Sequence, residues 1–154
     1  MEFISLTAAA TLTEWSERTF WRRFKDGAIK RELHNGKAVV QFRAIAANAC
    51  IPLDDAAVAL VAQADAGNAT AQTDLALLFL ENRRPKGALA WLELAAKQDH
   101  GNAMYLLGAF LIAGDGGEKD ENLGLMWVCK AASHQNSFAT AVLQSIFSKL
   151  SHGN

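Results

Sequence analysis

The pattern of apolar and polar residues along this chain changes near residue 50. Beyond that point apolar residues recur every three or four positions, which predicts amphipathic helices. The predicted helices lie near residues 54–66, 69–82, 86–98, 102–113, 121–134 and 137–149. The first 46 residues instead combine two short helical segments with two short strand-like runs. The pattern therefore predicts a mainly α chain, with a small mixed unit in front of a longer helical array.

Residues 16–27 have the pattern of one short helix with a defined start and stop. Ser16 can accept from the N–H groups of the first turn, and Gly27 suits the left-handed conformation at which helices often end. At about 100° per residue, Phe20 and Phe24 fall on one side of this helix. The other side gathers a tryptophan and three cations: Arg18, Trp21, Arg22 and Lys25. A helix with an apolar underside and a cationic outer face fits recognition in the major groove of duplex DNA.

The segments on both sides of this helix support that interpretation. Upstream, residues 5–12 predict an Ala-rich helix, and residues 13–15 form a short turn into the next helix, which is the helix-turn-helix order. Downstream, Asn35-Gly36 between two strand-like runs, 29–33 and 38–42, predicts a hairpin with a type I′ turn, because both central residues need positive φ. The hairpin carries four basic residues that we expect to hold the DNA backbone or the minor groove: Lys30, Arg31, Lys37 and Arg43.

Residues 4–45 resemble the winged-helix module of excisionases and MerR-type regulators. The resemblance is carried by an Ala-Ala pair, a Ser-x-x-Thr helix opening, an Arg-rich run, an acidic residue before glycine, and the hairpin. The matching residues are Ala9, Ala10, Leu12, Ser16, Thr19, Phe20, Arg22, Phe24, Asp26, Gly27, Ile29, Gly36 and Phe42. In that family the second helix and the wing contact DNA, which the resemblance carries over to Arg18, Trp21, Arg22, Lys25 and Lys37. The sequence departs from the family at Ala8, where Glu is common, at Glu14, where Gly is common, and at Arg23, where an aromatic is common.

The second half of the chain is a repeat. Gly67-Asn68-Ala69 aligns with Gly101-Asn102-Ala103 and then with Ser137-Phe138-Ala139, at offsets of 34 and 36 residues, which are typical of helix-turn-helix solenoids. The unit with the Gly114–Gly117 loop closely resembles the Sel-like repeat, a relative of the tetratricopeptide repeat with a Gly-rich loop between its two helices. The preceding unit has Asn82-Arg83-Arg84-Pro85 in place of that loop. Because a helix pair cannot cover its own apolar face, we expect the units to stack and the last helix to cap the stack.

These patterns divide the chain into modules. We expect a winged helix-turn-helix domain over 1–46, a short linker over 47–53, an α-solenoid of Sel-like repeats over 54–150 and a tail over 151–154. Pro52 disfavours helix at the residue before it, which marks the boundary. A linker this short predicts that the two modules are in contact.

Charge follows the same division. The net charge is −1 at pH 7, yet residues 1–46 hold eight Lys and Arg against five Asp and Glu, and the remainder holds seven against eleven. A cationic first part joined to an anionic second part indicates contact with nucleic acid through the first part.

Other chemistry has little support in the sequence. Cys50 and Cys129 have no paired spacing, so we expect neither a zinc site nor a disulfide, and two unpaired thiols favour the reducing cytoplasm. The acidic residues around the Gly114–Gly117 loop lack the spacing of a calcium-binding EF-hand. The four histidines are scattered, so we expect no enzyme, no cofactor and no metal. No run approaches the ~20 apolar residues of a membrane span, and the first residues lack the pattern of a signal peptide.

Two functions remain open from the sequence. The first is a sequence-specific or architectural DNA-binding protein, a regulator or accessory factor of bacterial or mobile-element type. Its repeats would recruit a protein partner or hold two copies together as a homodimer, because one such domain covers only a few base pairs. The alternative is a protein–protein adaptor whose repeats bind a partner and whose winged helix is a docking module without affinity for DNA. The cationic outer face of helix 16–27 favours the first.

Overall fold

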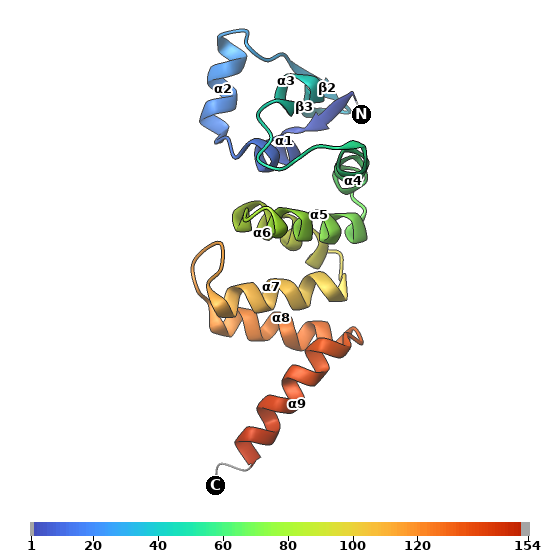
Figure 1. Ribbon diagram of the computed structural model, residues 1–154, viewed down its shortest axis with the longest axis vertical. Coiled ribbons are helices and arrows are strands. Elements are labelled where there is room, and N and C mark those ends of the chain that lie inside the picture. Colours follow the sequence, from blue (N-terminus) through green and yellow to red (C-terminus); the bar gives the residue numbers. More distant parts are fainter. Residues whose placement is uncertain (1, 152–154) are drawn as a thin grey trace.

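The computed structural model describes residues 2–151, and it shows a mainly helical chain extended along one axis (Figure 1). A small unit of helices and strands lies at one end, and the remaining helices follow it toward the C-terminal end. The elements of this N-terminal unit are β1 (Phe3–Ser5), α1 (Leu6–Thr13), α2 (Glu17–Lys25), β2 (Arg31–His34), β3 (Lys37–Gln41) and α3 (Phe42–Ala46). The elements after it are α4 (Asp55–Asp65), α5 (Ala69–Glu81), α6 (Pro85–Ala96), α7 (Gly101–Ala113), α8 (Glu121–Ser133) and α9 (Ser137–Ser151). Of the expected tail, Ser151 ends α9, and residues 152–154 lie outside the described residues.

The strands of the N-terminal unit form one antiparallel sheet in the order β1-β3-β2. The predicted hairpin is confirmed, since Asn35 and Gly36 have φ values of 51° and 77° between the paired residues His34 and Lys37. Strand β1 and helix α3 were not expected from the sequence. Because α3 begins at Phe42, the expectation that Arg43 lies on the hairpin is wrong.

Local capping explains where the two helices before the hairpin begin and end. The Ser16 hydroxyl accepts from the N–H of Thr19 at 3.2 Å, and Gly27 has a φ of 70°, so both predicted ends of α2 are confirmed. The Ser5 hydroxyl accepts from the N–H of Ala8 at 3.1 Å, so α1 is capped although Glu is absent at residue 8. Glu14 ends α1 in the left-handed region with a φ of 54°, at the position where the family resemblance expects glycine.

The N-terminal unit has a small core of its own. Phe20 is fully buried and is the one residue of α2 classed as buried, so α2 docks through its aromatic side. Its ring centroid lies 5.4 Å from that of Trp15 and 6.1 Å from that of Phe24. The other core residues of this unit come from every element around it: Ile4, Ala8, Ala9, Leu12, Ile29, Val40 and Ile45. The outer side of α2 is thereby held toward solvent.

Helices α5 to α8 are two helix pairs that pack at close range. A Cβ atom added at Gly108 of α7 would lie 2.6 Å from the carbonyl oxygen of Gly124 in α8, so these two backbones nearly touch. A Cβ atom added at Gly87 of α6 would lie 2.3 Å from the ring of Phe79 in α5. Glycine at these positions sets the spacing within each pair. Trp91, Leu92 and Leu75 are large side chains buried in this array.

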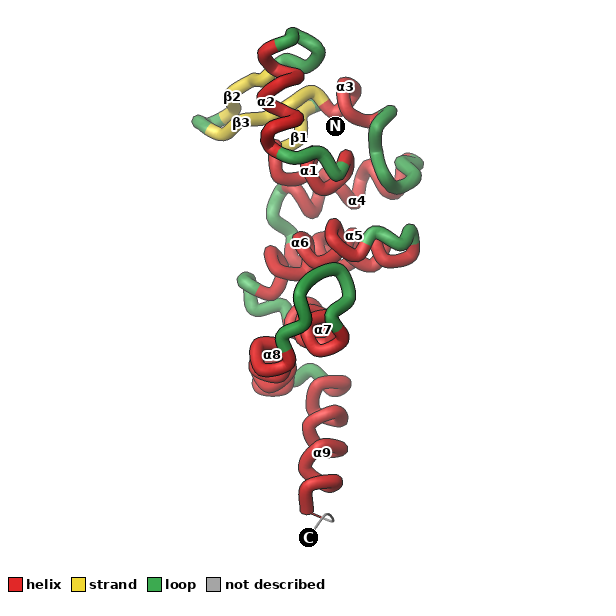
Figure 2. The backbone as a smooth tube through the Cα atoms, turned by 90° about the vertical axis from the view of Figure 1, so that its left-hand side faces the viewer, coloured by secondary structure: helices red, strands yellow, loops and turns green. Residues whose placement is uncertain are grey.

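The expectation that α9 caps the stack is correct only for its first half. Ala139 is buried, and Val142 and Leu143 are half-buried against the core. The second half of α9 projects beyond α8 (Figure 2). Phe147 and Leu150 lie in this half and are 66 % and 69 % exposed. A capping helix has a polar outer face, whereas this one continues its apolar stripe into solvent.

The N-terminal unit and the repeats are in contact, as the short linker predicts. The Ser5 backbone N–H donates to a carboxylate oxygen of Asp65 in α4 at 2.8 Å. The Arg84 guanidinium, between α5 and α6, donates to the Glu14 carboxylate at 3.1 Å and to the Cys50 carbonyl at 3.3 Å. The first bond attaches the start of α1 to α4, and the Arg84 bonds attach both the turn between α1 and α2 and the segment after α3 to the loop between α5 and α6.

Candidate functional site

The outer face of α2 brings together the four residues that the sequence assigns to the major groove. Arg18, Trp21, Arg22 and Lys25 are all exposed, and with Thr19 they line one surface depression. The burial of Phe20 on the opposite side fixes this orientation. The geometry therefore gives a single cationic surface with an aromatic ring in it, which we call the α2 face.

The stability of helix α2 explains why some residues of the α2 face are cationic, but it does not explain the whole face. Cations in the last turn of a helix interact favourably with its dipole, and Arg22 and Lys25 stand in that turn. The dipole does not account for Trp21, which is 53 % exposed. The rings of Trp21 and Phe24 are nearly perpendicular, with their centroids 5.8 Å apart. No ion pair joins a cation of the α2 face to a carboxylate in the described part of the chain, so these charges are available to an anionic partner.

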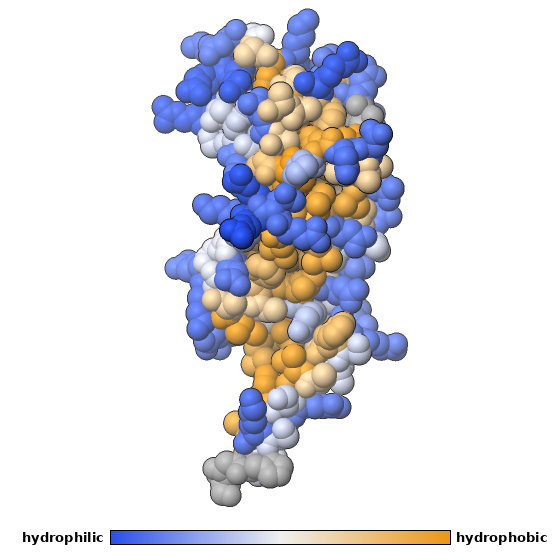
Figure 3. All heavy atoms as spheres, viewed as in Figure 1, coloured by the Kyte–Doolittle hydropathy of each residue, from blue (hydrophilic) through white to orange (hydrophobic). Residues whose placement is uncertain are grey.

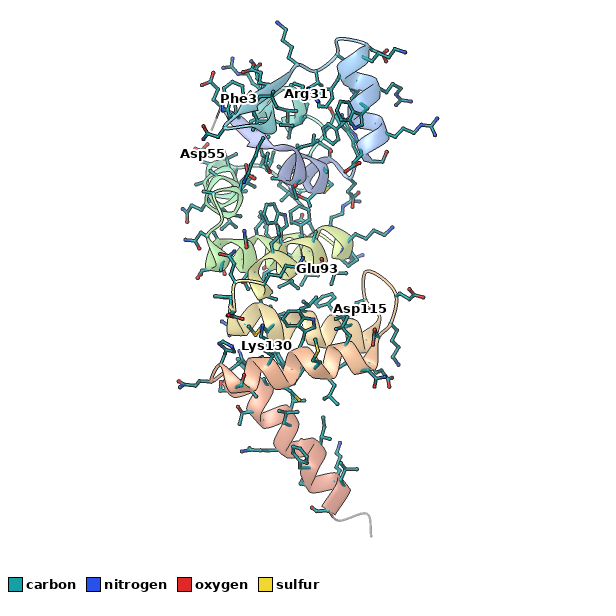
Figure 4. The ribbon with its side chains drawn as sticks, turned by 180° about the vertical axis from the view of Figure 1, so that it is seen from behind. Phe3, Arg31, Asp55, Glu93, Asp115 and Lys130 are labelled. Carbon is teal, nitrogen blue, oxygen red and sulfur yellow. The ribbon has the colours of Figure 1, made fainter. Side chains whose placement is uncertain are left out.

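The four basic residues assigned to the hairpin are exposed but do not form one group. Arg31 in β2 lies 5.2 Å from the centroid of the Trp21 ring, which joins it to the α2 face (Figure 4). Lys30 directly precedes β2, and Lys37 begins β3 at the tip of the hairpin. Arg43 lies in α3, beyond the opposite end of β3. The structure therefore separates Lys37 from Arg43 by the length of the strand.

Two arginines have structural roles that the sequence did not indicate. The Arg23 guanidinium stacks on Trp15 at 3.9 Å from the ring centroid, so it packs against the unit instead of facing solvent with Arg22. Arg84 pairs with Glu14 across 70 residues of sequence. The Arg84–Glu14 pair has no short-range signal, because it depends on how distant elements pack, whereas Arg23 and Trp15 are only eight residues apart.

The repeats expose a second candidate surface at their C-terminal end. Phe138 in α9 is 67 % exposed, similar to Phe147 and Leu150, and its ring stacks on Tyr105 of α7. The large apolar residues of α8 and α9 that are exposed are Leu123, Leu125, Met126, Phe138, Ile146, Phe147 and Leu150, and we call them together the α8–α9 surface. Leu123 lies apart from the α9 residues, in a depression that it lines with Leu107 and Trp127. On the face seen in Figure 3, hydrophobic residues lie over α8 and the start of α9, and mostly polar residues lie over the last turns of α9. Exposed apolar patches of this kind commonly mark contact sites for other proteins.

The described residues offer little for other chemistry. Within residues 2–151, no three His, Cys, Asp or Glu side chains lie together as ligands for a metal ion. Burial, followed by the charge of Glu14, raises the pKa of the Cys50 thiol, which disfavours the reactive thiolate. None of the described helices combines the length and the apolar character needed to cross a membrane.

The comparisons with known proteins support the repeat architecture. No protein-family model matches the chain, and no curated protein matches it. Among solved structures, the chain is similar to the crystal structure of a Sel1 repeat protein from Oxalobacter formigenes. The TM-score is 0.56 and the sequence identity 25 %, and the match covers 90 % of this chain and 88 % of that chain. Because the match covers more of the chain than α4 to α9 occupy, it includes part of the N-terminal unit.

Proposed function

We propose that this chain is a protein-interaction protein whose α8–α9 surface binds a protein partner, and that it is not an enzyme. The observation that carries the proposal is the exposure, at 66–69 %, of Phe138 at the start of α9 and of Phe147 and Leu150 in its projecting second half. The similarity to a Sel1 repeat protein supports it, because repeats of this type resemble tetratricopeptide arrays, which present extended binding surfaces.

The size of the exposed side chains makes binding favourable. Fully burying a Phe, Leu or Met side chain contributes roughly 1.5–3 kcal/mol relative to leaving it exposed. A partner that covers the large side chains of the α8–α9 surface therefore gains several kcal/mol, before the cost of association. Lys149 is the one charged side chain of α9, so the contact is expected to be largely apolar. A second copy of the chain and a different protein both meet this requirement.

The test compares a surface variant with a matched control. Phe147→Ser/Leu150→Ser changes the α8–α9 surface, and Leu33→Ser/Leu77→Ser changes two exposed leucines elsewhere. Sedimentation velocity measures self-association of each purified chain. Proteins captured from the host cell are purified and titrated against the same chains by calorimetry. We expect self-association, or binding of a purified protein, that the control variant retains and the surface variant loses. The proposal is refuted if the chain is a monomer and if no purified protein binds it more tightly than it binds the surface variant.

The α2 face favours a second function, which is binding of duplex DNA by the N-terminal unit. We propose that this unit is a winged helix-turn-helix, with α2 in the major groove and the β2–β3 hairpin as the wing. The order of α1, turn, α2 and hairpin supports this, as does the exposed set of Arg18, Trp21, Arg22 and Lys25. Lys30, Arg31, Lys37 and Arg43 would contact phosphates. Two copies joined through α8–α9 would give such a protein two DNA-binding units in the cytoplasm.

The DNA proposal is tested by fluorescence anisotropy of the full chain with random duplex DNA over a range of salt concentrations. Arg18→Ala/Arg22→Ala is compared with Lys97→Ala/Lys149→Ala, which removes the same charge from the repeats. An arginine that reads a base contributes on the order of 1–3 kcal/mol, so the first variant should bind much more weakly and the second nearly as wild type. Absence of binding at low salt would leave the N-terminal unit as a docking module for protein.

A further inference from the structure

The loop between α5 and α6 lies next to the turn between α1 and α2. Residues on both sides of this junction line one surface depression, among them Glu14, Trp15, Arg83, Arg84 and Lys86. Figure 1 shows the junction of α5 and α6 on the same side of the molecule as α2, below its N-terminal end. A macromolecule lying along the α2 face would therefore come close to this loop.

The loop is unusually basic for the repeats. Three of their seven Lys and Arg residues, Arg83, Arg84 and Lys86, fall within four positions. Arg84 is used inside the molecule, where its bonds to the Glu14 carboxylate and the Cys50 carbonyl hold the loop in place. The same ion pair neutralises Glu14, the acidic side chain that lines the depression.

Arg83 and Lys86 are left facing solvent. Both are exposed, and neither is in an ion pair among the residues that the structure describes. Arg83 has a φ of 58°, a left-handed conformation that disfavours any side chain and favours glycine. The loop thus has arginine where the backbone itself favours glycine, and two exposed cationic side chains near the turn that leads into α2.

The corresponding loop of the next unit has the opposite charge. Residues 114–120 carry Asp115, Glu118 and Asp120 with one lysine. Asp115 points away from the helices on this same side of the molecule (Figure 4). Asp115 and Arg83 line a shared depression without forming an ion pair. The α2 face and the α5–α6 loop are thus two cationic groups, with the exposed Glu17 at the start of α2 between them, and Asp115 lies beyond the loop.

We infer that Arg83 and Lys86 form a second contact with DNA, which binds backbone phosphates of the same duplex that lies on the α2 face. This inference rests on the DNA binding proposed for the N-terminal unit. The first repeat is then part of the DNA-binding surface, held there by the pair of Arg84 with Glu14. Phosphate contacts of this kind add affinity and register without reading sequence.

The test measures the salt dependence of binding to random duplex DNA for the full chain and three variants. Arg83→Gln/Lys86→Gln removes the two cations, and Lys97→Gln/Lys149→Gln removes the same charge elsewhere in the repeats. Asp115→Asn removes the carboxylate that lies beyond the loop. Thermal unfolding of each variant confirms that it is folded. Affinity falls as salt rises, and each lost phosphate contact reduces the magnitude of the slope of log affinity against log salt by about 0.9.

The loop variant is expected to bind on the order of tenfold more weakly, with a slope smaller by about two, while the Lys97/Lys149 variant keeps the wild-type slope. Asp115→Asn is expected to bind more tightly. If the wild type binds and the loop variant matches the Lys97/Lys149 variant, the inference is wrong and the α2 face alone binds DNA. If the wild type does not bind at low salt, the DNA-binding proposal itself is overturned.

Discussion

Replacing Gly108 by alanine is expected to destabilise the repeats, although alanine is the better helix former. In α7 an added Cβ would lie 2.6 Å from the carbonyl oxygen of Gly124 and 3.1 Å from the backbone nitrogen of Val128. It would also lie 2.8 Å from a methyl group of Val128. Two of these three atoms belong to the backbone of α8, so no change of rotamer relieves them. The helices α7 and α8 must move apart.

Two opposing effects set the magnitude. In a helix interior, Gly→Ala is favourable by about 0.8–1 kcal/mol. Overpacking costs typically about 1–3 kcal/mol, and rigid backbone neighbours place this site toward the upper end. The net loss is therefore about 1–2 kcal/mol. For a chain of this size, that lowers the melting temperature by about 2–8 °C.

The assay is thermal unfolding followed by circular dichroism, with Gly101→Ala as the matched control. A Cβ at Gly101 would lie no closer than 3.6 Å to its nearest neighbour, the His134 carbonyl oxygen, so alanine fits there. We expect the melting temperature of the control to equal or exceed that of the wild type. If Gly108→Ala unfolds at or above the wild-type temperature, α7 and α8 do not approach each other in solution as closely as they do in the structure.

Two further predictions concern single side chains. Cys129 is exposed, whereas Cys50 is half-buried with a raised thiol pKa, so a thiol reagent at pH 8 should modify Cys129 well before Cys50; equal rates measured by mass spectrometry would contradict this. The hydrogen bond and charge of Lys130 lower the pKa of the Asp99 carboxyl, so this ion pair is present above the ordinary value of 3.8 and is lost as pH falls through the lowered pKa. Lys130→Met should therefore raise the pKa of Asp99 in an NMR titration, and an unchanged value would show that the pair does not form in solution.

The features that the sequence predicts well are local ones. Ser16 and Gly27 set the ends of α2 through bonds within a few residues, and Asn35-Gly36 defines its turn by backbone conformation alone. The helices of the repeats follow from spacing that each segment carries by itself. The burial of Phe20 beneath the α2 face follows in the same way from helical periodicity.

The features that the sequence misses depend on packing between distant segments. Strand β1 has three residues, too few for a periodic signal, and it exists because it pairs with β3. The position of Arg43 depended on where β3 stops, and α3 follows it directly. The Glu14–Arg84 pair and the projection of α9 beyond α8 are properties of the assembled chain. The identity of the N-terminal unit as a DNA-binding winged helix stays a prediction.

Site-specific photo-cross-linking in the host cell would test most directly whether the repeats, and not the N-terminal unit, hold the protein partner. A photoreactive phenylalanine analogue replaces Phe147 on the α8–α9 surface in one chain and Trp21 on the α2 face in another. Both side chains are more than half exposed, at 66 % and 53 %, so neither replacement disturbs the core. We expect a discrete protein adduct from position 147, with a second copy or another protein, and none from position 21. A protein adduct at position 21 with none at position 147 would contradict the account.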